Sequence, residues 1–144
     1  MKTLQLLTAA TILLLLTACA SFGAGPFTTA DEPHATLEAV INADVTDSLF
    51  PGLLVKVDGK GVPSSPQRRT YHLPPGDYVL SLVPDRDGIQ QFENNYGRNY
   101  QLPRIFFERN IRVTLEEGKR YKFGVIIKRY NYSDWQPYVQ EIKD

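Results

Sequence analysis

The residue whose type and position most clearly indicate chemistry is Cys19, the single cysteine of this chain. It follows a positive charge at Lys2, the apolar run Leu4 to Leu16 and the small pair Thr17-Ala18. A run of about 13 residues is too short for a membrane span, which needs roughly 20. We therefore expect residues 1–18 to be a secretory signal peptide that is removed, which leaves the thiol at the start of the mature chain.

The stretch Leu16-Thr17-Ala18-Cys19 resembles the lipobox of bacterial lipoproteins, in which an aliphatic residue and two small residues precede the cysteine. The resemblance implies cleavage between Ala18 and Cys19, a diacylglycerol on the Cys19 thiol and an acyl chain on its amine. The triplet Ala18-Cys19-Ala20 also satisfies the small-x-small rule of an ordinary signal peptide, with cleavage after Ala20. We expect the lipidated form, because the one thiol of the chain stands at the consensus position.

Lipidation of Cys19 would determine both a partner and a location. A second acyl chain already turns marginal membrane binding into stable anchoring, since each buried methylene contributes about 0.8 kcal/mol. In Gram-negative lipoproteins an aspartate after the cysteine commonly retains the protein in the inner membrane, whereas Ala20 and Ser21 follow here. The resemblance therefore implies a protein held by membrane lipid at the cell envelope and, if the cell is Gram-negative, at the outer membrane, facing the periplasm.

The remaining reactive side chains form no catalytic or metal-binding pattern. No serine lies in a nucleophile elbow, and His34 and His72 lack the spacing of a ligand pair. Asp85-x-Asp87-Gly88 opens like a calcium loop but lacks the later ligands, so a solvated turn is the better interpretation. The 16 basic and 16 acidic residues balance, which argues against a nucleic-acid partner. We expect no enzyme, no cofactor and no metal.

The best candidate for ligand binding is the polar stretch 84–104. Sugar recognition commonly pairs aromatic faces with amide and guanidinium donors, and this stretch contains Asn95, Tyr96, Arg98 and Tyr100. We expect a long loop, which in a compact domain is often functional. The alternative is that these rings pack onto the domain or cover its edge, as would a second aromatic group formed by Tyr130, Tyr132, Trp135 and Tyr138.

The chain divides into the signal peptide (1–18), a lipidated N-terminus with a tether (19–33) and one folded domain (34–144). Glycine and proline without hydrophobic periodicity predict that the tether is flexible. A mature chain of this size is one domain on the usual expectations and can bury nearly two-thirds of its surface. With Cys19 lipidated, no thiol remains for a disulfide, so the domain must fold on its packing alone.

Short strands separated by turns fill the domain. Residues 36–45 alternate between apolar and polar side chains and predict a strand, although a helical stripe is also present at Leu37, Val40, Ile41 and Val45. Asp58-Gly59 and Pro74-Pro75-Gly76-Asp77 are turn signals. They delimit three further predicted strands, at 53–57, 69–73 and 78–83.

The clearest alternation lies in residues 107–115 and 121–127, on either side of the turn 116–119. One apolar side on each predicts an antiparallel hairpin that lies on a core, with Phe107 on the buried face and Gly124 on the outer face. Residues 135–142 predict a last strand at an edge, because their proline cannot donate to a ladder. About seven short strands and no convincing helix predict an all-β fold, an antiparallel β-sandwich of immunoglobulin-like or transthyretin-like type.

Three turn motifs resemble a domain of unknown function in small bacterial lipoproteins that is related to PEGA-type domains. They are Val57-Asp58-Gly59-Lys60, Leu73-Pro74-Pro75-Gly76 and Leu115-x-x-Gly118-Lys119-x-Tyr121. The resemblance covers residues 52–127 and implies an envelope location and a sandwich fold, without an activity or catalytic residues to carry over. The chain departs from that pattern at Tyr78, where histidine is common, and in the long insertion 84–104.

We therefore expect a lipid-anchored envelope protein whose domain is a non-catalytic interaction or structural module, with an envelope protein or glycan as its partner. The alternative is a glycan- or peptidoglycan-binding module that uses the stretch 84–104. A hydrolase built around His72 is a third class with little support.

Overall fold

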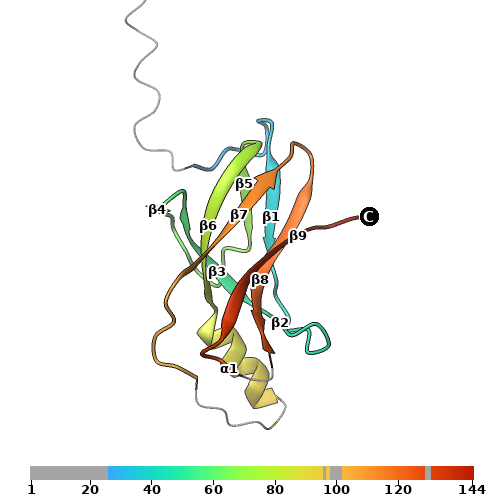
Figure 1. Ribbon diagram of the computed structural model, residues 1–144. Coiled ribbons are helices and arrows are strands. Elements are labelled where there is room, and N and C mark those ends of the chain that lie inside the picture. Colours follow the sequence, from blue (N-terminus) through green and yellow to red (C-terminus); the bar gives the residue numbers. More distant parts are fainter. Residues whose placement is uncertain (1–25, 96, 98–101, 129–130) are drawn as a thin grey trace, which may run out of the picture.

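Two β-sheets face each other as the layers of a sandwich in the computed structural model, which describes residues 26–95, 97, 102–128 and 131–144 (Figure 1). The first sheet contains β1 (Ala35–Ala39), β2 (Leu49–Phe50), β5 (Thr70–Leu73), β8 (Arg120–Ile127) and β9 (Trp135–Glu141). The second sheet has the order β4 (Lys60–Gly61), β3 (Gly52–Val57), β6 (Gly76–Pro84) and β7 (Arg109–Leu115). The predicted all-β sandwich is confirmed.

One helix accompanies the sheets. Helix α1 (Arg86–Asn95) lies at one end of the sandwich (Figure 1). In the part of the chain that the structure describes, no helix is long and apolar enough to cross a membrane.

Strand β8 is the central strand of the first sheet. On one side it pairs with β9 along its length, from Tyr121↔Glu141 to Ile127↔Trp135, and β9 is the predicted edge strand. On its other side it pairs first with β1 in parallel and then with β2 in antiparallel orientation. The parallel pair is the one departure from the antiparallel pattern among the strands described.

The core consists of two apolar clusters. The larger cluster fills the space between the sheets and includes Leu37, Leu80 and Phe123, each at most 1 % exposed. The smaller cluster lies at the α1 end, where Phe50 and Ile89 pack with Ile127, Tyr132 and Trp135. The second cluster therefore fixes the helix to the end of the sandwich.

The predicted hairpin between residues 107–115 and 121–127 is wrong. The turn after β7 exists, with Gly118 in the left-handed region at φ 75°, but β7 pairs with β6 while β8 belongs to the other sheet. Each strand has one apolar face, and two such faces can meet across a core as well as lie side by side. Alternation reports the buried face and does not identify the neighbouring strand.

Strand β7 also begins later than predicted, at Arg109. Phe107, which was expected on the buried face, is 82 % exposed. Arg109, the first residue of the strand, is exposed; its guanidinium carbon lies 5.1 Å from the centroid of the Trp135 ring, and its Nη1 donates a hydrogen bond to the Trp135 carbonyl.

The predicted strand 36–45 is half as long in the structure. Strand β1 ends at Ala39, and its Leu37 is fully buried. Ile41 and Val45, which continue the alternation, are 57 % and 42 % exposed. The helical alternative for this segment is excluded by the pairing of β1 with β5 and β8.

The stretch 84–104 contains α1, where a loop and no helix were expected. Asp85 caps the helix, with its Oδ1 accepting a hydrogen bond from the Gly88 N–H at 3.2 Å. Ile89 and Glu93 are fully buried at a spacing of four residues, which places them on one face. The polar composition and Gly88 concealed this face, because only one strongly apolar side chain of the helix is fully buried.

Part of the predicted tether contacts the domain. The Phe27 ring lies 5.1 Å from the ring of Tyr71, and the Thr28 N–H donates to the His72 carbonyl at 3.0 Å. The segment from residue 26 onward is thus packed against β5.

Candidate ligand groove

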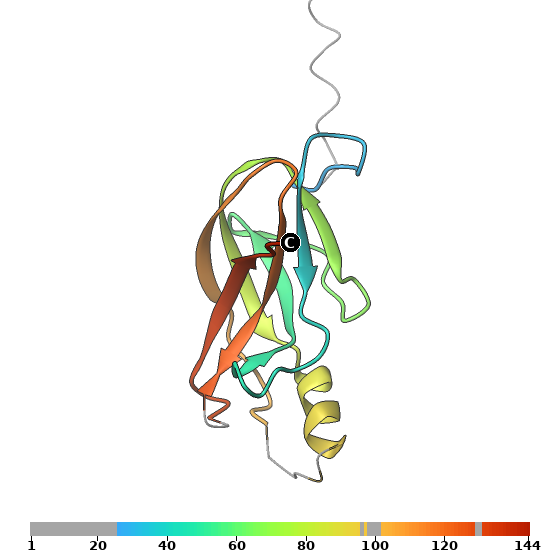
Figure 2. The ribbon, with the colours of Figure 1, turned by 90° about the vertical axis from the view of Figure 1, so that its right-hand side faces the viewer.

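A groove of about 520 Å³ lies between α1, the loop before β5 and the segment that follows β1. Figure 2 shows the loop and the helix on the same side of the domain, with the segment after β1 running toward the helix. Its wall also includes the start of β3. The groove thus combines side chains from four parts of the chain that the sheet topology brings together.

Two arginines, Arg68 and Arg69, form one wall of the groove. The guanidinium carbon of Arg68 lies 4.7 Å from the ring centroids of both Phe27 and Tyr71, a cation–π arrangement. Burial raises the pKa of the Tyr71 hydroxyl, and the charge of Arg68 opposes that rise. The Arg69 carbonyl accepts a hydrogen bond from the Ala39 N–H at 2.7 Å, so the backbone of this wall is joined to β1.

Two carboxylates, Asp85 and Asp87, stand at the helix wall of the groove. Asp85 is 9 % exposed, and its backbone N–H donates to the Pro51 carbonyl at 3.0 Å. A Cβ atom added at Gly88 would lie 2.7 Å from Asp85 Oδ2, so the glycine provides the space that this carboxylate occupies. Asp87 is exposed in the first turn of α1, where the helix dipole favours a negative charge.

Amide side chains complete the polar lining. Gln91 and Asn95 come from α1, and Asn42 comes from the segment after β1. Phe92 forms an apolar part of the wall and packs edge-to-face on Phe50, with the ring centroids 5.8 Å apart. Guanidinium, carboxylate and amide groups together suit reversible binding of a polar ligand.

The predicted ligand residues are placed only in part. Asn95 is exposed and lines the groove. Tyr96, Arg98 and Tyr100 lie outside the described residues, as do Ala18 and Cys19. Arg68 and Arg69, which the sequence interpretation did not single out, reach the groove because the loop before β5 folds toward α1.

Two members of the second aromatic group, Tyr132 and Trp135, belong to the core, as the alternative interpretation expected. Tyr132 and Trp135 are 5 % and 3 % exposed. The Tyr132 hydroxyl donates a hydrogen bond of 2.7 Å to Oε1 of Glu93, a fully buried carboxylate on α1. Tyr138 is half-buried, and Tyr130 lies outside the described residues.

His72, the centre of the third hypothesis, is half-buried on β5. Its ring packs edge-to-face on His34 with the centroids 4.4 Å apart, and its Nδ1 lies 3.5 Å from the Thr36 hydroxyl. Among the described residues, no group of three or more histidine, cysteine, aspartate or glutamate side chains could hold a metal ion.

Comparison with known proteins adds no identity to this geometry: no protein family, no curated protein and no solved structure matches the chain.

Proposed function

We propose that this protein is a lipid-anchored cell-envelope protein whose sandwich domain is a non-catalytic interaction module, and that its partner binds at the groove beside α1. The lipobox-like stretch ending at Cys19 supports the anchor. The resemblance to PEGA-related lipoprotein domains, carried by turn motifs, agrees with an outer-membrane protein that faces the periplasm.

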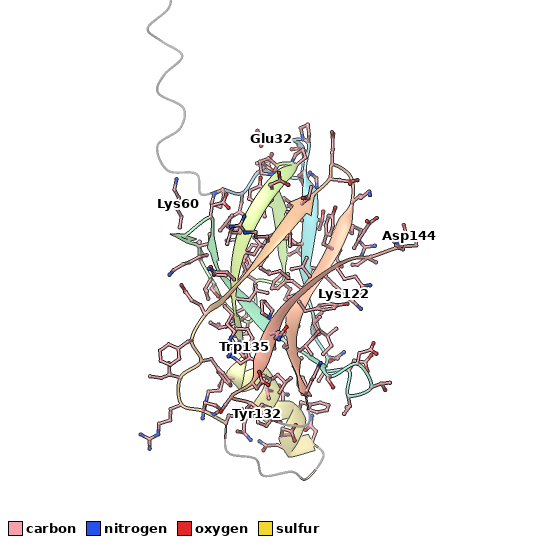
Figure 3. The ribbon with its side chains drawn as sticks, in the orientation of Figure 1. Glu32, Lys60, Lys122, Tyr132, Trp135 and Asp144 are labelled. Atoms are coloured by element: carbon pink, nitrogen blue, oxygen red, sulfur yellow. The ribbon has the colours of Figure 1, made fainter. Side chains whose placement is uncertain are left out.

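The observation that carries the proposal is the groove with its charged walls. Helix α1 lies at the opposite end of the sandwich from Glu32 and the start of the described chain, as Figure 3 shows for Glu32 and Tyr132. The six residues 20–25 can extend at most about 25 Å between Cys19 and the domain. An acylated Cys19 would therefore keep the domain close to the bilayer, with the attachment at the end of the sandwich opposite α1.

Photo-crosslinking in intact cells tests this proposal. A photoreactive amino acid replaces Gln91, an exposed residue of the groove, and in a control protein it replaces Glu117, an exposed residue of the turn after β7. We expect a discrete crosslinked product from position 91 that position 117 does not give. Equal products from both positions, or no product from position 91, would contradict a partner at the groove.

A second candidate function is binding of glycan or peptidoglycan. The placement of Asn95 in the groove, beside Gln91, favours it, because amide side chains are frequent partners of sugar hydroxyl and acetamido groups. We expect the protein to sediment with purified cell-wall sacculi and Asn95→Ala to reduce the bound fraction severalfold. Asn110→Ala and Asn131→Ala would not serve as controls, because Asn110 Oδ1 accepts a hydrogen bond from the Ser81 hydroxyl and Asn131 Oδ1 accepts one from the Ser133 N–H. The exposed Gln136 on β9 lies away from the groove lining.

Gln136→Ala, which also removes an exposed amide, is therefore the control, and it should sediment as the unmodified protein does. Binding that persists in Asn95→Ala and in the double variant Tyr96→Ala, Tyr100→Ala would remove the glycan candidate.

A further inference from the structure

We propose that the groove binds a zwitterionic peptide group, with the ligand carboxylate at Arg68 and Arg69 and its ammonium at Asp85 and Asp87. This inference rests on the proposed function and assigns its groove a class of ligand. The two arginines and two aspartates belong to separate elements that share one cavity.

The charged side chains that line the groove do not form ion pairs with one another in the described part of the chain. In the described part of the chain, neither Arg68 nor Arg69 forms an ion pair with a carboxylate or donates a side-chain hydrogen bond. Asp87 likewise pairs with no cation there, and Asp85 uses Oδ1 to cap the helix. Charges of both signs around one cavity, without direct ion pairs, are complementary to a ligand that carries both signs.

Arg68 is the best-positioned of these groups. Its guanidinium carbon lies 4.7 Å from the ring centroids of both Phe27 and Tyr71. These two contacts restrain the side chain before any ligand binds. A guanidinium held over aromatic rings keeps its N–H donors in its own plane, where they can engage both oxygens of a carboxylate. Preorganisation of this kind lowers the entropy that binding would otherwise cost.

The balance of charge decides against other anions. Two arginines alone would suit a phosphate, but the two aspartates in the same groove repel a dianion and bring the sum of these four side chains to zero. A neutral sugar could hydrogen-bond these side chains but would bring no opposite charge to either wall. A peptide end with a free amine and a free carboxylate satisfies both walls, and a groove of about 520 Å³ has the size of a small-ligand site.

Calorimetric titration of the full mature protein in detergent, with trialanine as the probe, tests the assignment. We expect trialanine to bind, and both its N-acetylated form and its C-terminal amide to bind about tenfold more weakly. Arg68→Gln and the exposed Arg69→Gln should each weaken trialanine about tenfold while losing the discrimination between the free carboxylate and the amide. Asp87→Asn should instead lose the discrimination against the acetylated form.

Arg112→Gln and Glu117→Gln change exposed charges outside the groove and should leave all three affinities unchanged. The inference is overturned if trialanine does not bind, if the blocked forms bind equally well, or if a chitin tetrasaccharide binds at the groove and trialanine does not. A crosslinked partner at position 91 together with absent trialanine binding would remove this ligand class and keep the proposed function.

Discussion

Replacing Gly124 with alanine is expected to lower the free energy of unfolding by about 3 kcal/mol, at the upper end of the usual cost of overpacking. The corresponding fall in the melting temperature is roughly 10 °C for a domain of this size. On local propensity alone the sign would be opposite, because glycine weakens a strand interior by up to about 1 kcal/mol relative to alanine.

Alanine is expected to destabilise this position because the chain passes close to Gly124 where it crosses from β2 in one sheet to β3 in the other. A Cβ atom at Gly124 would lie 2.6 Å from the Phe50 carbonyl oxygen and 3.1 Å from Val40 Cγ2. The first neighbour is backbone and cannot rotate away. On the other side of the same contact, a Cβ at Gly52 would lie 3.2 Å from the Gly124 backbone. The passage from β2 to β3 thus depends on two glycines that face each other.

Gly61→Ala is the matched control. It also lies in a strand, β4, but nothing stands within 4 Å of the Cβ it would add, and its φ is not in the left-handed region. Thermal and urea unfolding of both variants should show Gly61→Ala unchanged or slightly more stable. A Gly124→Ala protein as stable as Gly61→Ala would mean that the two strands cross elsewhere.

Replacing Cys19 with alanine is expected to move nearly all of the protein from the membrane fraction to the soluble fraction of the cell envelope. Without the thiol no diacylglycerol can be attached, and each methylene lost from the bilayer removes about 0.8 kcal/mol of binding. Trp135 and Tyr132, which otherwise favour interfaces, are buried in the core and contribute no alternative attachment.

Fractionation of cells expressing Cys19→Ala, with Ser21→Ala as the control that keeps the thiol and a small neighbour, measures this effect. The control should stay with the membranes after a carbonate wash. Retention of Cys19→Ala in the washed membranes would show that the protein is held there by something other than an acylated cysteine.

Sequence patterns located most strands because alternation directly reports which face is buried. Tyr71 and Leu73 of β5, and Tyr121, Phe123 and Val125 of β8, are buried as their alternation predicted. Pairing between strands could not be obtained in the same way. The turn at Gly118 is compatible with a hairpin or with a crossing between sheets, and only packing of the whole chain selects the crossing.

The helix was missed for a different reason. Its N-terminal signal, Asp85 before the buried Ile89, is present in the sequence, but Asp-Arg-Asp-Gly has the composition of a turn. Gly88 disfavours a helix by about 1 kcal/mol relative to alanine, and the structure explains it by the nearby Asp85 carboxylate. Gly124, expected on the outer face, is likewise buried because another segment of the chain covers it.

The groove was the least accessible part to sequence reasoning. Asn95 was singled out for its chemistry and does line the groove. Arg68 and Arg69 stand 26 or more residues earlier, in a stretch without a motif, and become neighbours of α1 only through the fold. Apart from their charge, nothing in the sequence indicates that these two arginines line a groove.

The most direct test of the central claim, a groove-bearing domain anchored by lipid, is the intact mass of the native protein after extraction from membranes. We predict an N-terminal Cys19 that carries a diacylglycerol on its sulfur and an acyl chain on its amine. A mature chain that begins at Ser21, or an unmodified residue 19, would contradict the account.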